Sequence, residues 1–260
     1  MDNKHYWNNE SNNFQKSFIR GKTDYNDKLI NFLKEQGMIY KGCRVIDIGC
    51  GVGKYSYYLA QEGCNVTLTD ISESMIEHAN KNMAEFPNEQ WNSITCNFEE
   101  YNFFDSHFQN GYDLSICNMS PAVYDLHTLR KMEMITNKWC FISRFSKWSQ
   151  PSRDELFNEL GITPYPFMQN LSKDCANLIQ CVSRIGYLPM VKYVDSSWID
   201  KRTPENAVNY IFDRYDFDVE ITDDIKKRAY EIANSMADSD GYFNDKVDAQ
   251  ACWIYFTKKI

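Results

Sequence analysis

Three glycines at alternate positions, Gly49, Gly51 and Gly53, follow the apolar run 44–48 and precede a segment with helical spacing. Glycine permits a positive φ angle and lets a ligand approach the backbone without a Cβ in the way. The start of the helix that follows adds backbone N–H groups that have no partner within the helix. This stretch predicts a turn that holds a nucleotide-like ligand at the end of a strand.

The residues around this turn distinguish between two classes of nucleotide ligand. A dinucleotide fingerprint, G-x-G-x-x-G, requires glycine where this chain has Lys54. Asp47, at the end of the first strand, is poorly placed beside a pyrophosphate but suits a ligand that carries an ammonium group. The local charges therefore favour a nucleotide that bears an amino acid over NAD.

The pattern D-x-G-C-G-x-G over residues 47–53 resembles the first motif of the Rossmann-like (class I) S-adenosylmethionine-dependent methyltransferases, above all those acting on small molecules. The resemblance covers residues 41–144 well and continues weakly into the strand that begins at Met190. It implies S-adenosyl-L-methionine as the cofactor. The cofactor-binding residues that it implies are Asp47, Gly49, Cys50, Gly51, Gly53, Asp70, Ile71, Asn97, Phe98, Asn118 and Met119.

The resemblance also implies particular roles for some of these residues. Asp70 matches an acidic residue that accepts hydrogen bonds from both ribose hydroxyls. Asn97 stands where the family usually has an aspartate that accepts from the adenine amino group, and its amide oxygen can still accept. The segment 5–14, with Trp7 and Phe14, resembles one that many members fold over the cofactor. Arg20 is a candidate for binding the methionine carboxylate.

Methyl transfer from a sulfonium is an in-line displacement, so the protein supplies alignment, a dry cavity and in some cases a base. We expect any catalytic base near the end of the fourth strand, where Tyr124 and His127 are the candidates. A capping or surface role is the alternative for His127. No His/Cys/Asp cluster has the spacing of metal ligands, so no metal is expected.

Strands and helices alternate along the chain, which predicts parallel strands joined by right-handed crossovers. The expected fold is α/β: a doubly wound, seven-stranded, mostly parallel sheet with a small helical insertion between the last two strands. The expected strands are 44–48, 66–70, 92–96, 113–118, 139–144, 190–198 and 251–258. Four helix starts are expected, at caps formed by Ser72, Asp125 and Thr203 and at a capping box over residues 152–155.

The domain organisation follows from the same pattern. We expect an N-terminal helical lid segment over residues 1–40 and a Rossmann-like methyltransferase domain over residues 41–260. Within that domain, a helical cap or insertion is expected at about 200–245. Its position suggests a role in selecting the methyl acceptor.

The amino-acid composition limits which partners and which compartment are expected for this protein. The net charge of −8 disfavours nucleic acid, which is usually bound by a basic face. The nine cysteines are scattered and include no C-x-x-C pair, so they indicate a reducing compartment rather than a disulfide framework. Residues 1–12 have no apolar core typical of a signal peptide, and no stretch has the length of a membrane span. We expect a cytoplasmic protein without membrane contact.

The predicted function is methyl transfer from S-adenosylmethionine to a small-molecule acceptor. The sequence Asn118–Pro121 lacks the paired prolines of the N/D-P-P-Y signature of amino-group methyltransferases. Two alternatives stay open: a non-catalytic domain that binds S-adenosylmethionine and acts through a protein partner, and methylation of a protein or RNA. The oligomeric state is not predicted.

Overall fold

The computed structural model describes residues 3–19, 21, 23–102, 111–165 and 171–258. Their strands form a seven-stranded sheet in the order β3-β2-β1-β4-β5-β7-β6, with β7 antiparallel in an otherwise parallel arrangement. The predicted doubly wound sheet is thereby confirmed. In sheet order the strands are β3 (Trp91–Thr95), β2 (Asn65–Asp70), β1 (Arg44–Ile48), β4 (Tyr112–Asn118), β5 (Thr136–Ser149), β7 (Phe243–Thr257) and β6 (Met190–Arg202).

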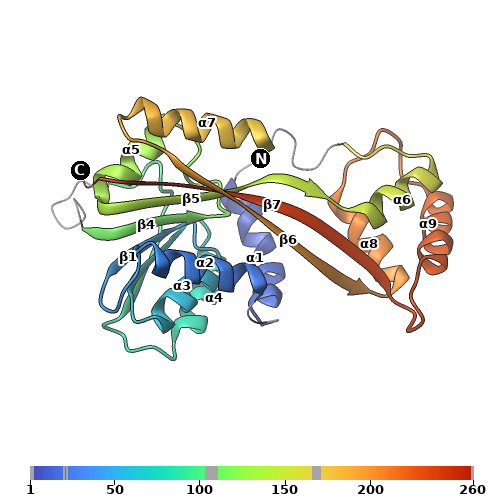
Figure 1. The fold of residues 1–260 in the computed structure, drawn as a ribbon. Helices are drawn as coiled ribbons and strands as arrows, with labels where there is room; N and C mark the ends of the chain where they lie inside the picture. Colours follow the sequence, from blue (N-terminus) through green and yellow to red (C-terminus); the bar gives the residue numbers. More distant parts are fainter. Residues whose placement is uncertain (1–2, 20, 22, 103–110, 166–170, 259–260) are drawn as a thin grey trace. The chain divides into compact units, whose positions relative to one another are not determined.

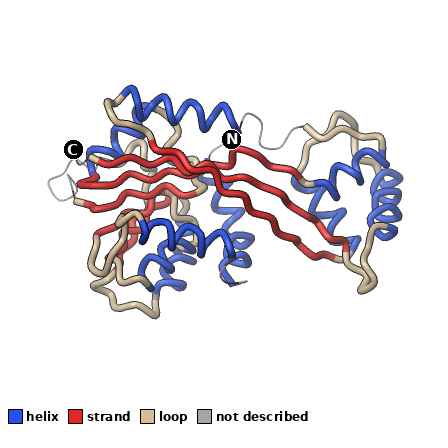
Figure 2. Tube along the Cα trace, viewed as in Figure 1, coloured by secondary structure: helices blue, strands red, loops and turns tan. Residues whose placement is uncertain are grey.

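Helices separate most consecutive strands along the chain, with two helices between β5 and β6 and two between β6 and β7. Figure 2 distinguishes the helices from the strands by colour. Ser72, Asp125 and Thr203 cap helices through their side chains, as predicted. The predicted capping box at residues 152–155 is wrong, because the helix there begins at Pro151 and the Ser152 hydroxyl donates to the Asn244 carbonyl instead. The helices are α1 (Asn3–Ile19), α2 (Asp24–Glu35), α3 (Lys54–Gln61), α4 (Glu73–Met83), α5 (Leu126–Ile135), α6 (Pro151–Leu160), α7 (Leu171–Arg184), α8 (Pro204–Arg214) and α9 (Asp223–Ser235).

The chain divides into two compact units. The first consists of Met1–Arg144, Lys173–Tyr193 and Cys252–Ile260, and the second of Phe145–Ser172 and Val194–Ala251. In the first unit, α2, α3 and α4 lie on one face of the sheet and α5 and α7 on the other (Figure 1). The second unit contains the helices α8 and α9 that were expected as an insertion, and also α6.

Three strands are clearly longer than the sequence pattern indicated: β6, expected at 190–198, runs to Arg202, and β5 and β7 differ more. β5 was expected at 139–144 and β7 at 251–258, but both extend well beyond these limits. In the added part of β7, buried and less buried residues alternate, and one of the buried residues is Asp245. A charged residue on the buried side hides the period of two that would have marked the strand.

Each unit has an apolar core of its own. In the first, Leu129 and Met132 of α5 and Leu178 of α7 pack with Ile142 of β5 and Ile254 of β7. In the second, a separate cluster joins α6, α8 and α9 and includes Leu156, Phe157, Val208, Ile211 and Ala229. Among the described residues no helix is both long and apolar enough to cross a membrane.

Candidate functional site

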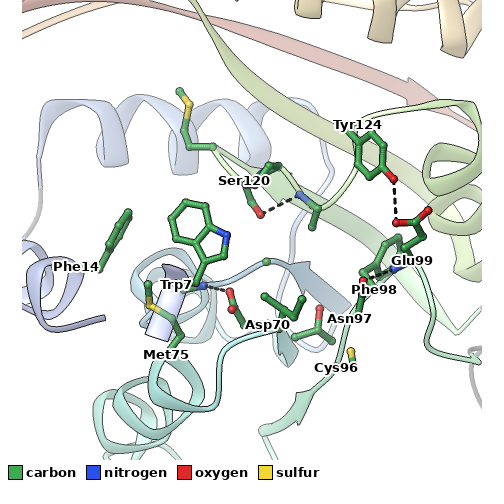
Figure 3. A pocket seen from close by; sticks show the side chains of 17 residues that line it. Trp7, Phe14, Asp70, Met75, Cys96, Asn97, Phe98, Glu99, Ser120 and Tyr124 are labelled. Carbon is green, nitrogen blue, oxygen red and sulfur yellow. Dashed lines mark hydrogen bonds between the residues drawn. The ribbon is translucent and has the colours of Figure 1, made fainter. Parts of the chain in front are cut away.

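A cavity of about 410 Å³ lies in the first unit, where β1, β2, β3 and β4 end (Figure 3). Carboxyl ends of parallel strands, at the point where the strand order reverses, are where ligands bind in open α/β sheets. The lining residues come from five segments: α1, the turn after β1, the end of β2 with α4, the end of β3, and the turn after β4. They are Trp7, Phe14, Gly49, Gly51, Thr69, Asp70, Ile71, Met75, Cys96, Asn97, Phe98, Glu99, Met119, Ser120, Pro121, Ala122 and Tyr124.

The glycine turn is fastened to β2 and packed against the turn after β4. The N–H groups of Gly49 and Cys50 both donate to the Thr69 carbonyl, at 2.8 and 2.9 Å. Gly49 has φ +70°, and a Cβ placed on it would lie 1.8 Å from the Ser120 hydroxyl oxygen. Gly53 also has a positive φ, but its missing Cβ makes room for Ala79 and Leu68 rather than for a ligand. Of the four predicted residues of this turn, Gly49 and Gly51 line the cavity, whereas Cys50 and Gly53 do not.

Asp70 ends β2 and points its carboxylate at the glycine turn (Figure 3). One oxygen accepts from the Gly51 N–H and the other from the Ser72 N–H, each at 2.9 Å. Burial raises the pKa of this carboxyl group, and the two backbone donors oppose the shift. Each carboxylate oxygen has a second lone pair, so Asp70 can still accept hydrogen bonds from a ligand in the cavity.

Asp47 lies behind the turn, within β1. It is almost completely buried and accepts a hydrogen bond of 2.6 Å from the Ser56 hydroxyl. Desolvation, with a smaller contribution from the charge of Asp70, raises its pKa to about 7. Asp47 does not line the cavity, so any effect that it has on a ligand acts through its charge and not through contact.

The residues after β3 form one side of the cavity. The Cys96 N–H donates to the Asp70 carbonyl at 2.8 Å, which holds this segment beside β2. The Asn97 side-chain oxygen accepts from the Glu99 N–H at 3.1 Å. Asn97 and Phe98, both predicted, line the cavity together with Cys96 and Glu99, for which no role was predicted.

The residues after β4 form the opposite side. Met119 lines the cavity, while Asn118 is buried and lies outside the lining. Tyr124 also lines it and donates a hydrogen bond of 2.9 Å to the Glu99 carboxylate (Figure 3). That bond is the largest cause of a raised pKa for Tyr124. His127 lies in the first turn of α5, is exposed and does not line the cavity.

Helix α1 contributes two aromatic side chains, Trp7 and Phe14, to the cavity. Asn8 fixes the helix to α4 by accepting from the Ser72 hydroxyl at 2.6 Å. The predicted carboxylate-binding residue Arg20 lies outside the described residues. Trp7 and Phe14 were predicted only through the family resemblance, because no local sequence pattern shows where a polar segment with interspersed aromatic residues will pack.

Comparison with known proteins identifies the family. The sequence family described as "Methyltransferase domain" matches residues 39–236 of this chain. The chain belongs to this family. It is an S-adenosylmethionine-dependent methyltransferase domain of class I, as the glycine turn predicted.

Curated relatives match this methyltransferase domain over a short stretch only. The ubiquinone biosynthesis O-methyltransferase of Coxiella burnetii is 51% identical over 51 residues, which are 20% of this chain and 21% of that protein. The chain thus matches only about a fifth of the length of that relative.

Solved structures share the fold over most of the chain. Magnesium protoporphyrin IX methyltransferase of Synechocystis PCC 6803, with bound SAH, aligns over 98% of both chains with a TM-score of 0.54 and 16% identity. Phosphoethanolamine N-methyltransferase 2 of Haemonchus contortus, in complex with S-adenosyl-L-methionine, covers 90% of this chain and 53% of that chain, with a TM-score of 0.50 and 14% identity. At these identities the likeness concerns the fold of the methyltransferase domain.

Proposed function

We propose that this methyltransferase domain binds S-adenosylmethionine in the cavity of the first unit and transfers its methyl group to a small-molecule acceptor. The main support for this assignment of the cofactor site is the position of Asp70. Its carboxylate is fixed by the Gly51 and Ser72 N–H groups at the edge of the cavity. A fixed anion with free lone pairs is suited to the two neighbouring hydroxyls of a ribose.

The other lining residues fit the remaining parts of the cofactor. The flat, apolar Phe98 and the polar Asn97 lie together, as an adenine ring requires. A Cβ on Gly51 would meet nothing nearer than the Met75 sulfur at 3.9 Å, so the methionine part could lie close to the backbone there. Asp47, with a pKa of about 7, is converted to its charged form by a neighbouring ammonium group, which favours a ligand of that kind.

Three features support a small-molecule acceptor. The net charge of −8 opposes binding of nucleic acid. The cavity is lined in part by the aromatic rings of Trp7, Phe14 and Tyr124. The short match to a ubiquinone biosynthesis O-methyltransferase is consistent with an acceptor of this class.

When bound, the cofactor supplies a methyl group activated by the positive sulfur. The chain's own residues align the acceptor and take up the proton that it loses. Of the two predicted candidates, Tyr124 is at the cavity, and we favour it over His127. The Tyr124 oxygen would accept the acceptor's proton while its own proton passes to Glu99, 2.9 Å away.

Two measurements test this function. Calorimetric titration with S-adenosylmethionine and, separately, NADH should show binding of the first alone. Incubation with S-adenosylmethionine tritiated in its methyl group and a cell extract should then give, only when the protein is added, a labelled compound in the ultrafiltrate that chromatography separates from S-adenosylmethionine. Label in protein or in RNase-sensitive material would contradict a small-molecule acceptor, and binding without any transfer would favour a non-catalytic domain.

A further inference from the structure

Met119 has an unusual backbone conformation at the wall of the cofactor cavity. Its φ angle of 53° is the one positive value that a residue other than glycine has in the described part of the chain. Side chains other than that of glycine are disfavoured in this left-handed region, so the surroundings must hold it there. Residues in such conformations are concentrated at functional sites.

Ser143 of β5 holds Met119 in this backbone conformation. The Met119 N–H donates to the Ser143 hydroxyl oxygen at 3.0 Å and to the Ser143 carbonyl at 3.3 Å. The preceding residue, Asn118, is the register partner of Ser143 in the sheet. Ser143 is fully buried, so water cannot replace the bond that its hydroxyl makes.

A chain of hydrogen bonds in turn fixes the Ser143 hydroxyl. It donates to the side-chain oxygen of Asn118 at 2.6 Å. The same oxygen accepts from the Tyr25 hydroxyl of α2 at 3.0 Å, and the Trp253 indole N–H of β7 donates to Tyr25 at 3.0 Å. Both branches of this network end at the Asn118 oxygen: one runs from the Trp253 indole through Tyr25, and the other from Met119 through Ser143. The Tyr25 hydroxyl also lies 3.5 Å from the Ser143 hydroxyl oxygen.

The turn that Met119 begins is in direct contact with the glycine turn. Ser120 follows Met119, and its hydroxyl occupies the space where a side chain on Gly49 would lie, 1.8 Å from the Cβ position. Both turns line the cavity (Figure 3). A change in the Met119 peptide would consequently displace Ser120 against the backbone of Gly49.

We propose that Ser143 is a positioning residue for the cofactor site, acting through the Met119 peptide. It holds Met119 in the left-handed conformation, which places Ser120 and Gly49 so that S-adenosylmethionine fits beside them. Asn118 and Tyr25 orient the Ser143 hydroxyl and do not touch the cofactor. This inference rests on the cofactor site proposed above.

The test is calorimetric titration of S-adenosylmethionine into the full chain and three variants. S143A should bind about tenfold more weakly, the effect of losing one buried hydrogen bond. Met119→Gly, measured alone as the baseline, should make the loss of Ser143 silent: Met119→Gly combined with S143A should bind within about twofold of Met119→Gly alone, since glycine adopts a positive φ without help. A purely structural role of Ser143 would not be silenced in this way.

Ser115→Ala is the matched control. Ser115 lies on the same strand β4 as Asn118, is fully buried, and accepts a hydrogen bond of 2.6 Å from Thr136 of β5. It does not line the cavity, so its removal should leave the affinity unchanged. If S143A does not fold, as judged by circular dichroism, Ser143→Cys replaces it, because a thiol keeps the volume and weakens the hydrogen bonds.

An unchanged affinity in S143A, beside tight binding by the wild type, would overturn this inference alone. An equally large loss on adding S143A to a folded Met119→Gly variant would overturn it as well. Wild-type protein that binds no S-adenosylmethionine would overturn the cofactor site and, with it, this inference.

Discussion

Buried carboxylates are stabilised in different ways in the two units. In the second unit, the Asp245 carboxylate forms a bidentate ion pair with the buried guanidinium group of Arg153. It also lies 3.3 Å from a guanidinium nitrogen of Arg202. In the first unit, Asp47 accepts from a neutral hydroxyl and Asp70 from two backbone N–H groups. The pKa values of Asp47 and Asp70 are both raised by burial.

This difference separates a carboxylate that stabilises the fold from carboxylates suited to a ligand. A buried charge that is paired with guanidinium groups is satisfied within the chain. A carboxylate that is buried among neutral donors costs stability until a ligand supplies further donors or a positive charge. Removal of charge should therefore have opposite consequences in the two units, and three substitutions test this.

Asp245→Asn should have the largest effect on stability. It leaves Arg153 buried with a neutral partner, which typically costs about 3–5 kcal/mol. Urea unfolding followed by circular dichroism measures the change. Lys246→Ala is the control, because Lys246 pairs with Asp248 at 2.8 Å on the surface, and loss of such a pair costs at most about 1 kcal/mol. Equal losses in the two variants would contradict the structural role of Asp245.

Asp47→Asn should have the opposite effect on stability: it should stabilise the folded chain at neutral and alkaline pH. The pKa of Asp47 is about 7 in the folded chain against an ordinary value of 3.8, so between these values the folded state binds more protons than the unfolded state. Stability that is present at low pH is then lost as the pH rises towards 7. At pH 8 the variant should be more stable than the wild type by up to about 4 kcal/mol.

Unfolding curves at intervals from pH 4 to pH 8 check this prediction. The wild type should lose stability relative to Asp47→Asn across that window, and the two should be similar near pH 4. Parallel curves for the two proteins would show that Asp47 is ionised in the folded state. They would also remove the distinction between Asp47 and the paired carboxylate of the second unit.

Asp70→Ala should have the smallest effect on stability, while weakening S-adenosylmethionine binding by about 10- to 100-fold through loss of hydrogen bonds to a charged acceptor. Titration calorimetry provides the measurement. Asp113→Ala is the control, because Asp113 also accepts a backbone N–H, that of Arg44 at 2.9 Å, at the other end of the sheet. Similar affinities for both variants would show that Asp70 does not contact the cofactor.

The sequence predicted the parts of the fold that local patterns determine. The glycine turn, the strand before it and the caps at Ser72 and Asp125 are each specified by residues within a few positions of one another. The extent of β7 could not be predicted, because Asp245 takes a buried strand position only when Arg153, 92 residues away, pairs with it.

The same limit applied to the site. Asp70, Asn97 and Met119 were predicted through the resemblance, which assigns its site residues to strand ends that are visible in the sequence: Asp70 ends β2, and Asn97 and Met119 come after β3 and β4. Ser143 and Tyr25 were missed, since their contacts with Asn118 span 25 and 93 positions. A motif describes which strand ends meet, and it carries no information on what packs behind them.

Helix α1 has a consequence for the timing of ligand exchange. Polar contacts join it to α4: Asn8 with Ser72, Gln15 with Asn82, and Lys4 with Glu73. Its detachment would expose the surface of one helix only, including the Phe18 ring that packs on Tyr57, so hydrogen exchange of its amides should depend less on urea concentration than exchange through global unfolding. The residence time of a nucleotide beneath Trp7 and Phe14 is then expected to follow this local opening and to shorten at high salt, while the rest of the first unit stays folded.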